Sequence, residues 1–411
     1  MCAVGAVRVR AGQIVDRFYT LVQPPAGVDS FQNRTFQVHG ITPEQGAAAR
    51  ERDDTSRRQT HPVVWVAMNA AEPSAFSVER FFTERELHIA AKNAAEFYGK
   101  LTEVLDPLAT YQHNNLGVPT GEQPTPAYFF RGQSDARWGL SSTLHRLYQD
   151  RFPKGYDTQS AERELAEAER RVLHEARRHG LIRGLNALEL LTVLQHHGTP
   201  TRLLDVTTDW RVALFFALGD DDATTDGRLF LISQNTPQQP AGNTGTNPQS
   251  DELYWWHLAD QALNTWNRTV TPILLPFTDA RMIAQRGFFL VGGLVSSRKG
   301  RSHYRGKSGN HSPLNNAEMR DVSSLAIELP NLPGQPEVNV AVPRFISKAN
   351  DSKWDASCVT IRIAGALKSN LRKQLAADGI FGNSIYPPLV DSRTHLANVA
   401  GPGLRPSSGK K

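Results

Sequence analysis

Apolar and polar residues alternate in several short runs along the chain, and in other stretches apolar residues recur every three or four positions. The first pattern is typical of strands with one buried face, and the second of amphipathic helices. Strands are predicted from Tyr128 onward, in the extended stretch beginning at Thr199, and over 227–233, 270–277, 288–291, 324–330 and 358–364. Helices are predicted over 160–180, 186–198, 210–218, 279–287 and 365–379. Strands and helices mix without a regular strand–helix–strand repeat, so the predicted fold is α+β, a mixed or antiparallel sheet core with flanking helices.

The same patterns divide the chain into segments. Alternation on either side of "RAGQ" predicts a two-stranded hairpin over 3–23, and a helix is predicted to open at Thr42. The predicted segments are a fragment over 1–46, a linker with a short strand over 47–69, a helical lead-in over 70–124, the main domain over 125–395 and a disordered tail over 396–411. The helix over 160–180 carries Glu/Arg pairs three and four apart and is interpreted as a solvated face.

Composition narrows the class of protein. Of 411 residues, 39% are hydrophobic and 21% charged, which is typical of a globular protein rather than a disordered one. No apolar run approaches the roughly 20 residues needed to cross a bilayer. No export signal is recognisable, and two cysteines are too few for a disulfide scaffold or a thiolate metal site. A reducing cytoplasm is therefore expected, with no membrane partner and no metal.

The formal net charge is +5, and part of this excess is local. Residues 296–311, "SSRKGRSHYRGKSGNH", carry five Lys or Arg residues and no acid. Such a loop is either a mobile, solvated segment or a surface that contacts nucleic-acid phosphates. Because the only aromatic residue in it is Tyr304, the solvated loop is the favoured interpretation.

The beginning of the chain, "GAVRVRAGQIVDRFYTLVQP" followed by "VHGIT", resembles the part of DEDD-type 3′-to-5′ exonucleases that lies after their first acidic motif. Two-metal nucleases need several carboxylates to hold their cations at the scissile phosphate. The sequence holds neither the strand with the first acidic pair nor a recognisable second acidic motif. Residues 1–46 are therefore interpreted as a truncated exonuclease-like fragment without catalytic acids, and nuclease activity is not expected.

Four separated blocks carry a second resemblance: "YFFRGQSDARWGLSSTLHR", "LLTVLQHHGTPTRLLDVTTDWRVALFFAL", "ARMIAQRGFFLV" and "VTIRIAGALKSNLRKQLAADGIFGNSIYPPL". Their order is similar to that of the FRG domain family, named for a Phe-Arg-Gly signature, and the resemblance covers about 125–395. It implies a domain common in bacterial proteins.

The same residues resemble toxin-type ADP-ribosyltransferases. Those enzymes hold a phosphate of NAD with an early-strand arginine, often before glycine, and use a Ser/Thr-rich strand end that leads into a helix. Arg131 looks like the first element, and Thr207–Thr208 before "WRVALFFA" looks like the second. The nearest counterpart of the family's catalytic glutamate is Gln285, so a transferase of this kind would need another acid, such as Asp205 or Glu328.

The predicted catalytic residues are Asp205 and Gln285. The predicted residues for binding NAD are Arg131, Gly132, Gln133, His196, Arg202, Thr207, Thr208 and Trp210. A guanidinium presents a planar fork of donors to phosphate oxygens, and an adjacent glycine lets a ligand approach the backbone.

Each of these residues also has a structural interpretation. Arg131 can pair with Asp205 and join two strands, and the two threonines can cap the following helix. His196 can pack at a helix end, while Trp210 and Trp138 suit an aromatic core better than a ligand ring. Arg202 and Asp205 lie three apart, which on a strand puts them on opposite faces, so they are not expected to pair.

The function expected from the sequence is binding of a nucleotide or another anionic small molecule, with NAD-dependent ADP-ribosyl transfer or NAD cleavage as the activity. The alternative is a non-catalytic module that binds nucleic acid or a nucleotide and is fused to an inactive exonuclease fragment.

Overall fold

The protein is described by a computed structural model over residues 2–10, 13–22, 76–116, 128–152, 156–180, 184–219, 224–235, 252–253, 255–256, 266–273, 280–295, 303–305, 311–349 and 354–386. The chain forms two compact units, Met1–Pro73 and Ser74–Lys411. In the first unit, β1 (Cys2–Arg10) pairs antiparallel with β2 (Gln13–Val22), with a register shift between Arg8 and Val9. This confirms the predicted hairpin. The helix expected at Thr42 and the short strand expected within 47–69 lie outside the described residues.

The second unit is built on a seven-stranded sheet of order β3-β11-β6-β4-β5-β8-β7. Its strands are β3 (Glu86–Leu87), β4 (Tyr128–Gln133), β5 (Leu204–Thr207), β6 (Gly227–Gln234), β7 (Val270–Ile273), β8 (Gly287–Gly292) and β11 (Ala356–Ile363). The β3–β11 pair is parallel, and the other pairs are antiparallel. A separate two-stranded ladder joins β9 (His303–Arg305) to β10 (His311–Pro313). The protein therefore has the predicted mixed α+β fold.

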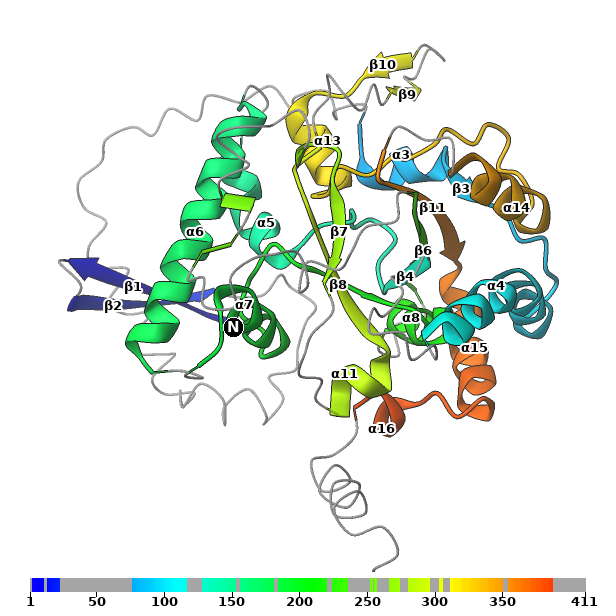
Figure 1. Cartoon of the computed structure of the whole chain (residues 1–411), viewed down its shortest axis with the longest axis horizontal. Coiled ribbons are helices and arrows are strands. Elements are labelled where there is room, and N and C mark those ends of the chain that lie inside the picture. The colour runs from blue at the N-terminus through cyan, green and yellow to red at the C-terminus, as the bar shows by residue number, and fades with distance from the viewer. Residues whose placement is uncertain are drawn as a thin grey trace, which may run out of the picture. The chain divides into compact units, whose positions relative to one another are not determined.

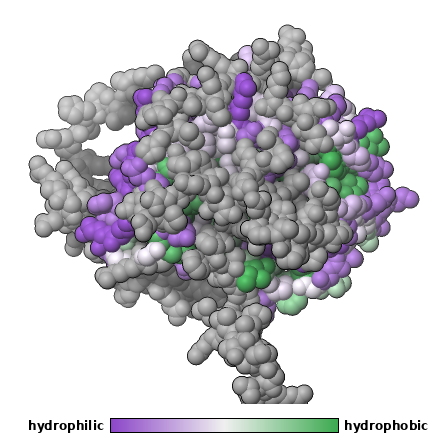
Figure 2. Space-filling view, viewed as in Figure 1, coloured by the Kyte–Doolittle hydropathy of each residue, from purple (hydrophilic) through white to green (hydrophobic). Residues whose placement is uncertain are grey.

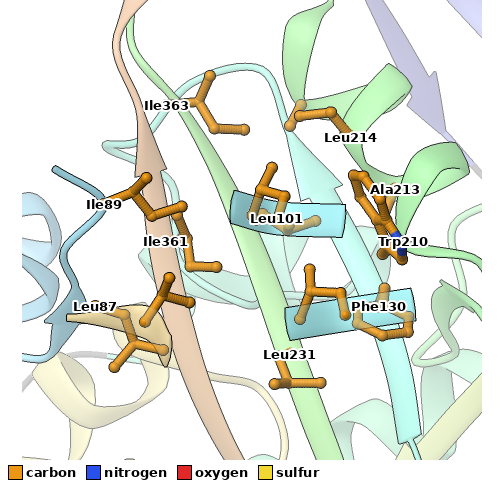
Figure 3. Close-up of a cluster of buried hydrophobic side chains, with 14 of the residues drawn as sticks. Leu87, Ile89, Leu101, Phe130, Trp210, Ala213, Leu214, Leu231, Ile361 and Ile363 are labelled. Atoms are coloured by element: carbon orange, nitrogen blue, oxygen red, sulfur yellow. The ribbon is translucent and has the colours of Figure 1, made fainter. Parts of the chain in front are cut away.

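One face of the sheet is covered by α4 (Ala94–Leu116), α8 (Trp210–Leu218), α14 (Val338–Ala349) and α15 (Gly365–Ala377). Figure 1 shows α4, α8 and α15 gathered beside this part of the sheet. Their apolar side chains meet those of the strands in one cluster, in which Figure 3 places Leu101 and Trp210 beside Phe130 and Leu231. Burial of this apolar surface is the main force that holds the helices to the sheet.

The opposite face packs against α3 (Val78–Thr83) and α13 (Asn316–Val322). Phe129 and Phe230 point to this side, whereas their strand neighbour Phe130 belongs to the first cluster, as expected where side chains alternate along a strand. Further helices are α5 (Thr143–Tyr148), α6 (Thr158–Arg178), α7 (Ala187–His196), α11 (Ala280–Gln285) and α16 (Gly382–Ile385). Helices α6 and α7 share a third apolar cluster with β7 and β8.

The structure corrects several expectations. Residues 324–330 do not form a strand, because only Glu328 makes an isolated bridge, to Ser357. Helices α13 and α14 were not predicted from the sequence; α13 begins with a capping box at Asn315, and Pro343 lies inside α14. Trp138, expected in the core, is 56% exposed. Figure 2 shows the coloured hydrophobic residues on one face as separate areas among hydrophilic ones.

The charged helix α6 is not simply a solvated face. Glu162 and Glu169 point inward and are 0% and 1% exposed. Arg202 lies between them, donating from Nη1 to Glu162 and from Nε to Glu169, each at 2.8 Å. Burial alone would lower the pKa of Arg202, but the Glu169 and Glu162 carboxylates raise it. The pairs within the helix, Glu167 with Arg170 and Arg171 and Glu175 with Arg178, are exposed as predicted, whereas the opposite face of the helix holds a buried acid–base cluster with Arg202.

Candidate functional site

A pocket opens where strands β4 and β5 diverge. The two strands pair through one residue pair, Phe130 with Thr207. Beyond that pair lies a cavity of about 660 Å³, bounded by β4, β5, β8, α7, α8 and α11. Of the residues predicted from the sequence, the described pocket wall contains Arg131, Gly132, His196, Asp205, Thr207 and Gln285.

Arg131 bridges the gap between the two strands. Its Nη1 donates to the backbone carbonyl of Asp205 at 2.5 Å and lies 3.8 Å from the Asp205 carboxylate. The Arg131 side chain is 17% exposed, and its buried Nε has no hydrogen-bond partner among the described residues. Burial lowers the pKa of Arg131; the Asp205 carboxylate opposes this shift, and the Arg146 cation adds to it. The pairing that the sequence left open is thus present, and the guanidinium also faces the pocket.

Asp205 is held in place from α7. Gln195 donates from Nε2 to Asp205 Oδ2 at 2.9 Å, and Gln195 Oε1 accepts from the Thr201 hydroxyl at 2.7 Å. The Asp205 side chain is 60% exposed, so its carboxylate is both oriented by protein groups and open to solvent. An oriented, accessible carboxylate can act as a base or stabilise a nearby positive charge.

A second guanidinium, that of Arg146, interacts electrostatically with the same carboxylate. It projects from α5 and donates from Nη1 to the Ser141 carbonyl at 2.6 Å. Burial lowers the pKa of Arg146, and the Asp205 carboxylate raises it. Two cations therefore interact electrostatically with the Asp205 carboxylate, Arg131 from the pocket wall and Arg146 from outside the described lining.

The threonine pair has a different local role from the one predicted. Asp209, and not Thr207 or Thr208, caps α8, since its Oδ1 accepts from the Arg211 amide at 2.8 Å. The Thr207 hydroxyl accepts from the Asp209 amide at 3.0 Å and donates to the Gln285 carbonyl at 2.7 Å. Thr207 thus ties the end of β5 to the end of α11. The predicted cap signature Thr207–Thr208–Asp209 therefore contains the cap, but the residue that caps the helix is Asp209 and neither threonine does so.

Gly132 is explained by helix packing. A Cβ atom at this position would lie 1.7 Å from the Ala213 carbonyl oxygen and 2.5 Å from the Ala217 amide nitrogen. The Phe-Arg-Gly signature therefore lets α8 approach β4 at van der Waals distance. The sequence had suggested close approach of a ligand, and the observed close neighbour is the backbone of α8.

Four other predicted residues lie outside the described pocket wall. Arg202 is held in the α6 cluster, and Gln133 donates to the Gly139 carbonyl at 2.9 Å. The Thr208 amide donates to the Arg286 carbonyl at 3.2 Å, and buried Trp210 donates from Nε1 to Asp106 at 2.8 Å. As expected, Arg202 does not pair with Asp205. Glu328, the other candidate acid, accepts from the Ser357 hydroxyl at 2.8 Å and is likewise not part of this wall.

Sequence reasoning missed Gln195, Phe216, Arg281 and Met282, which all line the pocket. His197 also lines it beside His196, with 6.0 Å between their ring centroids. Gln195 directly precedes His196 and His197. The sequence pointed to the two histidines at this helix end but not to the glutamine. The other three carry no local signal, because only the packing of α8 and α11 brings them to one cavity.

Among the described residues, no group of three or more His, Cys, Asp or Glu could hold a metal ion. No helix in the described part of the chain is long and apolar enough to span a membrane. Most of the basic segment 296–311 lies outside the described residues.

Comparison with known proteins finds a family match over part of the second unit, and this match includes part of the pocket wall. Residues 126–226 match the FRG domain model, and this segment contains β4, α5, α6, α7, β5 and α8. The match does not extend to residues 1–46, so their likeness to exonucleases stays a prediction. No curated protein and no solved structure matches the chain. Residues 126–226, which supply Arg131, Gln195 and Asp205 to the pocket wall, therefore carry the match to the FRG domain family.

Proposed function

We propose that the pocket of the FRG domain binds a nucleotide through its phosphates and that NAD is the nucleotide. The observation that carries this proposal is the charge at the junction of β4 and β5, where Arg131 and Arg146 interact with one carboxylate, Asp205. Guanidinium groups match phosphate oxygens in geometry and are retained where such recognition is needed. The cavity volume of about 660 Å³ lies within the range of small-molecule and cofactor sites.

The reaction proposed for bound NAD is cleavage of the bond between nicotinamide and ribose. Nicotinamide would leave with the bonding electron pair, and the ribose carbon would gain positive charge. The Asp205 carboxylate, oriented by Gln195 and 60% exposed, would stabilise that charge and accept a proton from the attacking water or target group. Arg131 would neutralise the phosphates, and Gln285, whose carbonyl is fixed by Thr207, would position the ribose.

The test is release of nicotinamide from NAD, measured by chromatography, in the full chain and in matched arginine variants. Arg131→Lys keeps the charge but removes the planar fork, so we expect release to fall at least about tenfold. Arg137→Gln is the control, because Arg137 is 67% exposed and pairs with Asp135 away from the described pocket wall. Melting temperatures establish that each variant is folded.

Two results would change the conclusion. Binding of NAD that depends on Arg131 without release of nicotinamide would make the domain a nucleotide-binding module and not an enzyme. Equal NAD affinity in the Arg131→Lys and Arg137→Gln variants would contradict the proposal altogether.

A further inference from the structure

The wall of the pocket contributed by α8 and α11 is aromatic and cationic. Phe216 of α8 and Arg281 and Met282 of α11 line it. Phe216 is partly buried, Arg281 is exposed and Met282 is buried. This wall therefore combines an aromatic ring, an exposed guanidinium and a buried thioether. None of these residues is needed for the phosphate contacts assigned to Arg131 and Arg146.

Tyr386, which follows α16, packs against two residues of this wall. Its ring centroid lies 6.3 Å from that of Phe216, nearly perpendicular to it at 84°, and 6.5 Å from that of Phe215. The Arg281 guanidinium carbon lies 4.7 Å from the centre of the Tyr386 ring. Three separate segments, from α8, α11 and the end of α16, therefore converge on one aromatic cluster.

The cluster is anchored although its surface is open. Ile385 is 1% exposed, whereas the adjacent Tyr386 is 44% exposed. The Ile385 carbonyl accepts from Gln285 Nε2 at 3.3 Å, and the Tyr386 amide donates to the Gly382 carbonyl at 2.8 Å. A buried neighbour, one side-chain hydrogen bond and one backbone hydrogen bond fix the backbone at this exposed aromatic residue, which favours a stacking role for its ring.

From this arrangement we propose that Phe216, Arg281 and Tyr386 form a subsite for the planar ring of a nucleotide, either adenine or nicotinamide. The inference rests on the proposed function, since the phosphates of the same ligand would bind Arg131 and Arg146. Aromatic side chains stack on bases of any sequence because every base presents a π face, and an arginine adds a cation–π contribution. The pocket therefore recognises a base at one end and phosphate at the other.

Calorimetric titrations of the full chain with pyrophosphate, AMP and nicotinamide mononucleotide separate the two ends of the pocket. We expect Phe216→Leu and Tyr386→Leu to weaken binding of at least one mononucleotide about tenfold while leaving pyrophosphate affinity within about twofold. Arg131→Lys should weaken all three ligands. Phe381→Leu is the matched control, because Phe381 is a 49% exposed aromatic at the other end of α16.

The mononucleotide whose affinity falls identifies the ring that the subsite holds. If pyrophosphate binds through Arg131 but neither aromatic variant affects either mononucleotide, the ring subsite is wrong and the phosphate site stands. If pyrophosphate and both mononucleotides fail to bind the unaltered protein, both proposals fail. Saturation-transfer NMR of the ligand ring protons gives a second readout, and its signal should be lost in Tyr386→Leu.

Discussion

Arg131 donates a hydrogen bond to the backbone carbonyl of Asp205 at 2.5 Å, across the place where β4 and β5 part. The two strands pair only at Phe130 and Thr207. The Asp205 carbonyl, two residues before Thr207 on β5, therefore has no backbone partner on β4. The guanidinium supplies that donor from a side chain. One residue thus satisfies a sheet carbonyl and presents its charge to the cavity that the divergence creates.

Replacing Asp205 by Asn should separate binding from chemistry. Asn keeps an oxygen that can accept from Gln195 but removes the negative charge that faces Arg131 and Arg146. We expect pyrophosphate to bind at least about threefold more tightly at low salt, because it no longer competes with that charge. Nicotinamide release should fall at least about 100-fold if the carboxylate is catalytic. Calorimetry at two salt concentrations measures the gain in pyrophosphate affinity, which should become smaller as the salt concentration increases. Unchanged affinity at low salt would place Asp205 outside the phosphate site.

The Gly132→Ala variant should unfold or lose more than about 3 kcal/mol of unfolding free energy, since the new Cβ would overlap backbone atoms of α8. Urea denaturation measures the loss. Gly99→Ala is the control: Gly99 lies in α4 with nothing within 4 Å of a built Cβ, so alanine should stabilise the protein by about 0.5–1 kcal/mol. A stable Gly132→Ala protein would mean that α8 does not approach β4 this closely.

Arg202→Met should cost about 3–5 kcal/mol, because it leaves the buried carboxylates of Glu162 and Glu169 without their counter-charge. Trp255 and Trp256 both donate from Nε1 to Glu169 at 2.9 Å, so tryptophan fluorescence reports on this cluster during unfolding. The exposed pair of Arg178 with Glu175 supplies the control. Arg178→Met should leave the midpoint of the unfolding transition nearly unchanged. Equal effects of the two substitutions would contradict the buried cluster.

His145 should make the fold sensitive to mild acid. Burial, helped by the Arg320, Arg146 and Arg202 charges, lowers the pKa of His145 from 6.5 to about 3. Between these values the unfolded chain binds a proton that the folded chain does not, so stability is retained above pH 6.5 and lost as the pH falls. Below pH 6.5 this group lowers the unfolding free energy by up to about 1.4 kcal/mol per pH unit, and His145→Phe should abolish that decrease. Denaturation curves recorded at several pH values measure it.

Exposed His174 provides the comparison for that experiment, and His174→Gln should keep the pH dependence of the unaltered protein. Parallel pH profiles for His145→Phe and the unaltered protein would show that the imidazole is protonated equally in both states.

Local pattern was enough to predict most elements of the FRG segment. An aromatic run gave β4 from Tyr128, and the largely apolar run after the polar residues Thr207–Asp209 gave α8, because polar cap residues followed by such a run favour a helix. The pattern failed over 324–330, where an apolar run is buried without joining the sheet. It also missed α14, where Pro343 breaks the sequence signal of a helix that packing stabilises.

The sequence by itself determined that Arg131 and Asp205 belong to neighbouring blocks and predicted a pocket between them. Only the tertiary structure decided that β4 and β5 diverge there, that Gly132 accommodates α8, and that Arg202 is held by the acids of α6. The reason is physical: a strand or helix is set by neighbours a few positions away, whereas charge pairing and close packing depend on groups that folding brings together from distant positions.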